Sequence, residues 1–106
     1  MSSVIYNKLV RDKIPEIINA TGKTCVYEPI SDGQYLEKLN EKLLEEVQEY
    51  LESGTLEELA DIGEVMHAIL AYKHIPLDEF QRVRTEKLEA RGGFEKRLLL
   101  KEVKEG

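Results

Sequence analysis

The sequence lacks several features that would assign it to particular protein classes. It has one cysteine among 106 residues, so no internal disulfide can form, which suits a reducing compartment. No apolar run approaches bilayer-spanning length, and the opening MSSVIYNKLVRDK has no apolar signal-peptide core. We therefore expect a cytoplasmic protein with no membrane partner. The sequence also has no repeats and no interdomain linker, so we expect one domain over residues 1–106.

The sequence gives little sign of nucleophilic or di-iron catalysis. Cys25 lies in an extended segment, and no motif links it to His67 or His74, so we expect it to serve packing. Glu64 and His67 form the Glu-x-x-His motif of di-iron helical bundles. Such bundles need two copies of that motif, and no glutamate stands at the matching position before His74.

Charge is distributed unevenly along the chain. The net charge is −6, but twelve acids and only two lysines lie between Glu28 and Glu64, which leaves thirteen basic residues and nine acids elsewhere. An acidic middle block repels nucleic-acid backbones and attracts cations. We therefore expect no nucleic-acid partner. By charge alone, a solvated acidic surface explains the block at least as well as a cation site does.

Hydrophobic periodicity predicts an all-α fold. Asp12 can cap the first helix, and Ser31 with Gln34 resembles a capping box before the second. Glycines follow each of the first two helices and the last. The segment after them, FEKRLLLKEV, fits either a strand or a helix. The helices are expected over about 14–20, 34–52, 56–73 and 76–91.

The arrangement of these helices follows from their connections. Short connections between long amphipathic helices favour antiparallel neighbours, and therefore an antiparallel helical bundle. The N-terminal region and residues 24–30 are expected to be irregular or extended, since Pro29 argues against a central strand. The core is small for so many apolar faces, so we expect a homodimer or homotetramer.

Four carboxylates border the apolar faces of the two central helices. At about 100° per residue, Glu58 falls inside the apolar arc of its helix and Asp61 at the edge of that arc. Glu46 and Glu49 lie at the border of the preceding stripe. Burying carboxylates without partners costs several kcal/mol each. Hard divalent cations bind such oxygens, so the four acids are candidate ligands of Mg²⁺.

Two of the four acids also have a structural explanation. Glu58 stands three residues after Thr55 and can complete a capping box. Glu46 can pair with Lys42 one turn earlier. For any single acid these explanations are about as good as the metal hypothesis. The matched spacing of all four on adjacent helices favours metal.

Basic residues form a counterpart to these acids. Arg84, Lys87 and Arg91 fall in the same arc as the apolar residues of the last helix. They either pair with acids of neighbouring helices or bind phosphates. Lys8 and Arg11 belong to a further basic cluster near the N-terminus. Acids for metal beside bases for phosphate are the arrangement expected for phosphate-ester chemistry on a nucleotide.

The acidic segments match a known signature. EEVQE at 45–49 followed by EELAD at 57–61 resembles the EExxE…ExxD motif of the MazG-like, all-α nucleoside triphosphate pyrophosphohydrolases. That group includes phosphoribosyl-ATP pyrophosphohydrolase and all-α dUTPases. The segments YNKLVRDKIPEII and RGGFEKR resemble a subgroup of small house-cleaning enzymes for non-standard nucleotides. The similarity spans most of the chain.

The resemblance implies Mg²⁺-dependent hydrolysis between the α- and β-phosphates, giving a nucleoside monophosphate and pyrophosphate, with Mn²⁺ as a possible substitute. It implies Glu46 or Glu49 as the proton acceptor from water, Glu45 as an auxiliary acid, and an all-α bundle assembled from dimers or tetramers. Only eight residues separate Glu49 from Glu58, fewer than in larger MazG proteins. Phosphoribosyl-ATP hydrolysis and a non-catalytic helical interaction module are the alternatives. The metal ligands would be Glu46, Glu49, Glu58 and Asp61, and the substrate-binding residues Lys87, Arg91, Arg84, Lys8, Arg11 and Lys42.

Overall fold

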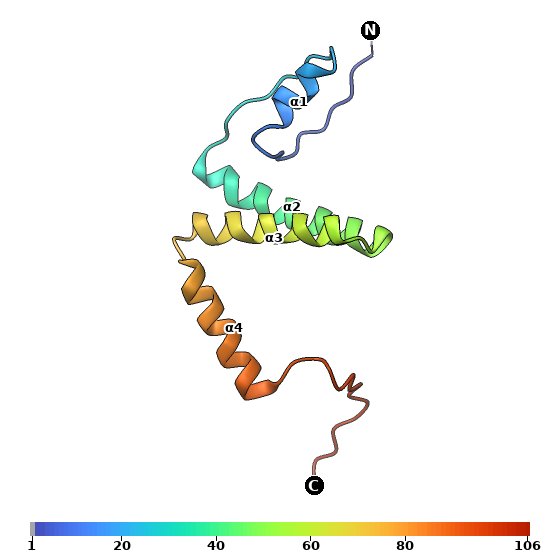
Figure 1. The fold of residues 1–106 in the computed structure, drawn as a ribbon, viewed down its shortest axis with the longest axis vertical. Helices are drawn as coiled ribbons and strands as arrows, with labels where there is room; N and C mark the ends of the chain where they lie inside the picture. The colour runs from blue at the N-terminus through green and yellow to red at the C-terminus, as the bar shows by residue number, and fades with distance from the viewer. Residues whose placement is uncertain (1) are drawn as a thin grey trace. The chain divides into compact units, whose positions relative to one another are not determined.

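The described part of the chain, residues 2–106 of a computed structural model, is all-helical, with four helices and no strand (Figure 1). The helices are α1 (Ile14–Ala20), α2 (Asp32–Ser53), α3 (Leu56–Tyr72) and α4 (Leu77–Arg91). These bounds agree with the predicted ranges to within two residues. The helices divide between two compact units, Met1–His74 and Ile75–Gly106, each of which is described by itself.

Helices α2 and α3 form an antiparallel hairpin that positions the acidic residues. They pack side by side and are joined only by Gly54 and Thr55, so they must run in opposite directions (Figure 1). Gly54 has a φ of 65°, the left-handed conformation that ends a helix at low cost for glycine. Its N–H donates to the carbonyl of Tyr50. The two acid-bearing segments therefore lie close to the same turn.

The buried face of the hairpin is narrower than the predicted stripes. Leu39 of α2 and Val65 of α3 are the buried apolar residues of the described chain. Helical spacing predicts that Leu59 and Met66 belong with Ile62 to the core-facing stripe of α3, but both are exposed. The face of α3 toward α2 is thus rotated toward Val65, which is also the side that carries Glu58.

The helix N-termini divide between confirmed and wrong predictions. Ser31 caps α2, because its hydroxyl accepts a hydrogen bond from the N–H of Gln34. The prediction that Asp12 caps α1 is wrong, since the N-cap position is Lys13 and no side chain bonds there. Pro15 lies in the first turn and has no N–H, and the N–H of Ile14 donates to a backbone carbonyl instead. Few backbone N–H groups at this helix end are therefore left for a side-chain cap to bind.

The second unit consists of α4 and the residues after it. α4 begins at Leu77, with Pro76 as N-cap, and ends before Gly92, whose φ is 81°. No residue of α4 is buried. FEKRLLLKEV, residues 94–103, fits either a strand or a helix by sequence, but it forms neither, because residues 92–106 contain only a short turn and irregular chain. None of the helices in the described residues is long and apolar enough to cross a membrane.

Candidate metal and phosphate site

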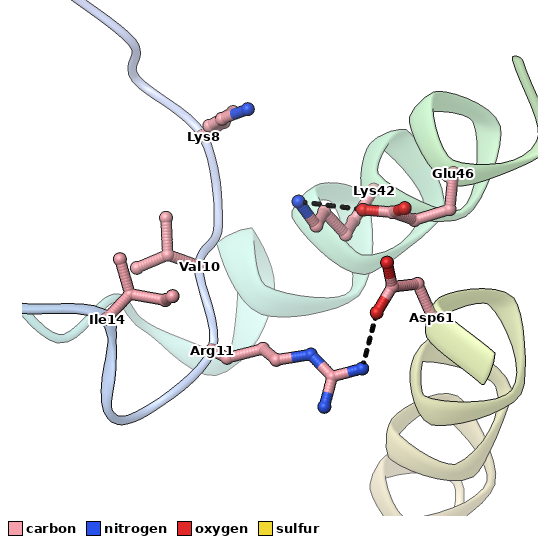
Figure 2. A pocket seen from close by; sticks show the side chains of 7 residues that line it. All are labelled: Lys8, Val10, Arg11, Ile14, Lys42, Glu46 and Asp61. Atoms are coloured by element: carbon pink, nitrogen blue, oxygen red, sulfur yellow. Dashed lines mark hydrogen bonds and ion pairs between the residues drawn. The ribbon is translucent and has the colours of Figure 1, made fainter. Parts of the chain in front are cut away.

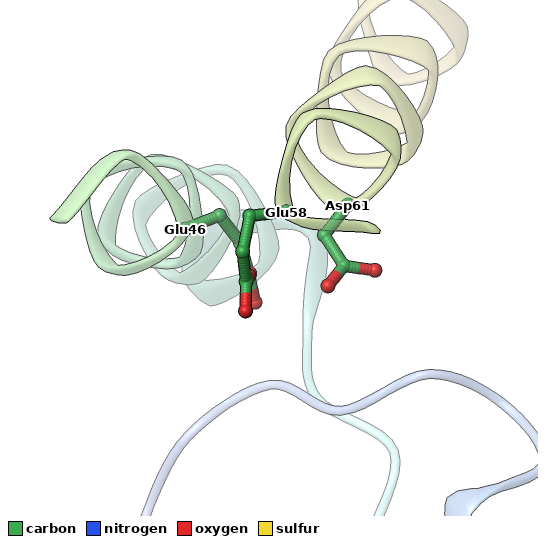
Figure 3. A group of neighbouring side chains, drawn as sticks. All are labelled: Glu46, Glu58 and Asp61. Atoms are coloured by element: carbon green, nitrogen blue, oxygen red, sulfur yellow. The ribbon is translucent and has the colours of Figure 1, made fainter. Parts of the chain in front are cut away.

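Three of the predicted metal ligands converge from the two helices of the hairpin. Glu46 of α2 and Glu58 and Asp61 of α3 each offer one carboxylate oxygen, and these oxygens lie within 4.8 Å of one another. Figure 3 shows the three side chains projecting to the same side of the hairpin, toward the N-terminal segment. Oxygens from three carboxylates at this spacing can bind one divalent cation, with water or phosphate completing its coordination.

The burial of these acids demands an electrostatic explanation. The side chain of Glu46 is only 6% exposed, and the residue is the one buried charged group of the described chain. The Oε2 atoms of Glu46 and Glu58 are buried and have no hydrogen-bond partner. Orphaned carboxylate oxygens are costly, and two of them in one cluster fit a cation-binding site. The donor set, all oxygen, suits Mg²⁺ or Mn²⁺.

Two acids of this region have a raised pKa. Desolvation, followed by the charge of Glu46, raises the pKa of Glu58. The pKa of Glu49 is also raised, chiefly by the neighbouring carboxyl of Glu46. Glu49 does not belong to the converging triad, but it borders the triad through Glu46. Burial for Glu58, and the hydrogen bond with Glu46 for Glu49, thus act together with the charge of Glu46 to disfavour the ionised form of each acid.

The structural explanation offered for Glu58 is wrong. Thr55 is the N-cap of α3 but makes no side-chain cap hydrogen bond, and its N–H donates to the hydroxyl of Ser53. Glu58 is therefore not held by a capping box. The corresponding explanation for Glu46 is confirmed in part, because the ammonium of Lys42 lies 3.1 Å from its Oε1. That ion pair leaves the second oxygen of Glu46 free for another cation.

A basic segment from the N-terminus lies over the acids. Figure 2 shows Arg11 reaching Asp61, with 2.7 Å between the guanidinium Nη2 and Oδ1. Arg11 and Lys8 line a pocket of 440 Å³ together with Lys42, Glu46 and Asp61. Three cations and two carboxylates thus share one pocket in the first unit.

Glu45 connects the basic residues on one side of this pocket. It accepts from Lys8 at 2.7 Å and from Lys42 at 3.4 Å. The hydrogen bond from Lys8 is the largest cause of the lowered pKa of Glu45. For Lys42, burial acts to lower the pKa, but its bonds to Glu46 and Glu45 outweigh burial, so the pKa is raised. Glu45 therefore holds two of the candidate phosphate ligands in place.

The basic residues of the last helix belong to the other unit. Arg84, Lys87 and Arg91 are exposed on α4, and none of them lines the pocket. Their assignment to substrate phosphates stays a prediction. Glu64 and His67 are both exposed and lie outside the converging triad, so no described group supports a di-iron site.

Two apolar residues of the pocket were missed by the sequence reasoning. Val10 and Ile14 line it beside Arg11. A signal existed in the alternation of apolar and basic residues through KLVRDKI, which places both kinds within a few residues of each other. Nothing in that alternation indicated which distant segment they would meet.

Comparison with known proteins adds a relative but no function. An uncharacterized protein of Mycolicibacterium smegmatis is 42% identical over 60 residues, which are 57% of this chain and 61% of that protein. The chain thus spans less than two thirds of that relative's length. No protein-family model matches the chain. No solved structure matches it either.

Proposed function

We propose that this protein is a divalent-metal-dependent nucleotide pyrophosphohydrolase that cleaves between the α- and β-phosphates. The observation that carries the proposal is the buried carboxylate of Glu46, whose Oε2 lacks a partner beside the equally orphaned Oε2 of Glu58. A protein without a cation for these oxygens would be more stable with amides in their place. The basic pocket beside them supplies the complementary site for phosphate.

The residues fit a metal in their chemistry and placement. Glu46, Glu58 and Asp61 would hold it, and Glu49 borders the group. When bound, Mg²⁺ or Mn²⁺ would polarise the phosphates and lower the pKa of the attacking water. Lys8, Arg11 and Lys42 would bind and orient the phosphate chain, because they are the cations of the pocket. The assignment of Arg84, Lys87 and Arg91 to substrate phosphates stays a prediction from the sequence.

Glu49 is the carboxylate best suited to accept the proton of the attacking water. Glu46 is already engaged by Lys42, whereas Glu49 lies outside the converging triad. A base that is not itself a principal ligand can turn toward the water.

The substrate class follows from the resemblance to the MazG-like group. The products would be a nucleoside monophosphate and pyrophosphate, and the biological role would be the removal of non-standard nucleotides. The fold proposed with this function is the helical bundle of that group, built as a homodimer or homotetramer from single-domain chains in the cytoplasm.

A nucleotide panel tests the function. Standard and modified nucleoside triphosphates and phosphoribosyl-ATP are incubated with the protein, with and without Mg²⁺ or Mn²⁺, and the products are resolved. We expect metal-dependent release of pyrophosphate and a monophosphate, lost in Glu58→Gln and kept in Glu57→Gln. Glu57 is the matched control because it is the adjacent, exposed acid of α3. Preferential hydrolysis of phosphoribosyl-ATP would identify phosphoribosyl-ATP hydrolysis as the reaction of this protein. No turnover of any compound would point to a non-catalytic helical module.

A further inference from the structure

Arg11 binds the same carboxylate that the metal would need. Its Nη2 lies 2.7 Å from Oδ1 of Asp61, and Asp61 is one of the three converging acids. In the metal-free chain the guanidinium therefore compensates part of the negative charge of the cluster. The compensation is incomplete, because two carboxylate oxygens remain without partners.

The two cations that contact the triad differ in how firmly they are held. Lys42 is 17% exposed and lies in the same helix as both of its partners, Glu45 and Glu46. Arg11 is 54% exposed, comes from a segment fifty residues away, and contacts Asp61 through one nitrogen. The remaining N–H groups of Arg11 make no other hydrogen bond in the described chain. Arg11 is the cation that can be displaced.

A divalent cation at the triad would oppose the Arg11 guanidinium. Two cations sharing one carboxylate repel each other, and partial burial strengthens that repulsion. Arg11 lines the pocket together with Lys8 and Lys42, so its side chain would remain near these cations after release from Asp61 (Figure 2). A guanidinium with a free pair of N–H donors is suited to bidentate contact with phosphate oxygens.

We propose that Arg11 substitutes for the metal in the metal-free protein and binds phosphate in the metal-loaded one, so that the divalent cation and the diphosphate group of the substrate bind with positive coupling. This inference rests on the proposed function, whose site it shares. It assigns Arg11 two successive partners, Asp61 and then phosphate, and it makes the enzyme bind metal-diphosphate far better than metal alone.

The test measures two affinities in the same variants. Mn²⁺ binding is followed by electron paramagnetic resonance without any anion, and binding of the preformed Mn²⁺–pyrophosphate complex by calorimetry. In Arg11→Ala, Mn²⁺ alone is expected to bind about tenfold tighter and the complex about tenfold weaker, within the range usual for coupled sites. Lys13→Ala removes the same charge from the same segment outside the pocket and should change both affinities little.

Opposite changes in the two affinities are the signature of the proposal. Arg11→Lys keeps the charge but loses the planar fork, so it should bind Mn²⁺ like the parent and the complex more weakly. This variant serves if Arg11→Ala does not fold. Affinities that change in the same direction, or no more than in Lys13→Ala, would overturn the coupling. If the parent protein hydrolyses nucleotides and the Arg11 variants bind both Mn²⁺ and the Mn²⁺–pyrophosphate complex like the parent, the coupling is refuted and the proposed function stands. A parent that binds no Mn²⁺ would refute the proposed function as well.

Discussion

At the scale of single residues, the site is defined by a surplus of negative charge. In the triad of Glu46, Glu58 and Asp61, Glu46 forms an ion pair with Lys42 and Asp61 forms one with Arg11. The buried Oε2 atoms of Glu46 and Glu58 nevertheless have no hydrogen-bond partner. A folded chain tolerates such oxygens only if other contacts offset their cost, or if a cation arrives. Stability and metal binding are therefore linked at these side chains.

Removing one carboxylate should separate stability from metal binding. We expect Glu58→Gln to raise the urea midpoint of the metal-free protein, because the change removes a charge that repels Glu46 and Asp61. The same change should weaken Mg²⁺ binding roughly 100-fold, since even outer-shell changes cost 10–100-fold. Denaturation in EDTA and in excess Mg²⁺ measures both effects, with Glu57→Gln as control. A variant less stable than the parent in EDTA would show that Glu58 holds the fold together.

The raised pKa values predict how stability depends on pH. Desolvation and Glu46 raise the pKa of Glu58, and Glu46 raises that of Glu49, both from an ordinary value of 4.5. Such groups bind more protons in the folded than in the unfolded chain. Stability of the metal-free protein should therefore fall as the pH rises from 4.5 through the raised values. Saturating Mg²⁺ should reduce this fall, because it favours the ionised carboxylates. Urea midpoints across this range in EDTA, flat or rising with pH, would contradict the assignment.

At the scale of elements, the α2–α3 hairpin is what brings the acids together. Its connection is two residues long, and Gly54 takes the left-handed conformation there with open space around its Cα. Any strain from a side chain at this position is thus conformational and involves no clash. The hairpin geometry depends on this one backbone position more than on any side chain in the turn.

Replacing Gly54 and replacing Gly33 by alanine should change the free energy of unfolding in opposite directions. Gly54→Ala should destabilise the protein by about 1 kcal/mol, because the left-handed backbone conformation is sterically unfavourable for an L-residue with a Cβ atom. Gly33→Ala, inside the first turn of α2 and also in open space, should stabilise it by about 0.5 kcal/mol. Chemical denaturation of both variants gives the comparison. Equal effects of the two changes would mean that the turn is not held in the left-handed conformation.

The helices were predictable from sequence, whereas part of the site was not. Periodicity and the Ser31 cap give α2 to within two residues, because both signals are local. The convergence of Glu46 with Glu58 follows from one short turn. The contact of Arg11 with Asp61 spans fifty residues, and no local pattern encodes such a pairing. The Asp12 cap was wrong because Pro15 has no N–H to satisfy and the N–H of Ile14 donates to a backbone carbonyl. The Thr55 capping box was wrong because the N–H of Thr55 donates to the hydroxyl of Ser53.

At the scale of the whole molecule, apolar surface is left uncovered within each unit. Leu44 and Leu51 are 60% and 74% exposed on α2, one heptad apart and therefore on the same face. In the second unit, α4 has no buried residue, and Leu98, Leu99 and Leu100 are exposed. Large uncovered apolar patches mark interaction surfaces. We propose that other copies of the chain cover them.

Self-association is therefore expected in solution. Size-exclusion chromatography with light scattering should give a dimer or tetramer of the 12.2 kDa chain. Leu44→Lys combined with Leu51→Lys should shift this assembly toward monomer, because charge on an apolar contact face opposes burial. A parent protein that is monomeric at high concentration would contradict the proposed assembly.

The most direct test of the central claim is to locate the bound metal in solution. Substoichiometric Mn²⁺ added to the isotope-labelled protein broadens the nuclear magnetic resonance signals of nearby amides. We predict that signals around Glu46 on α2 and around Glu58 and Asp61 on α3 vanish first, and that Glu58→Gln abolishes this selectivity. Broadening spread evenly over the acidic surface, or centred on other acids such as Glu41, would contradict a metal site between the two helices.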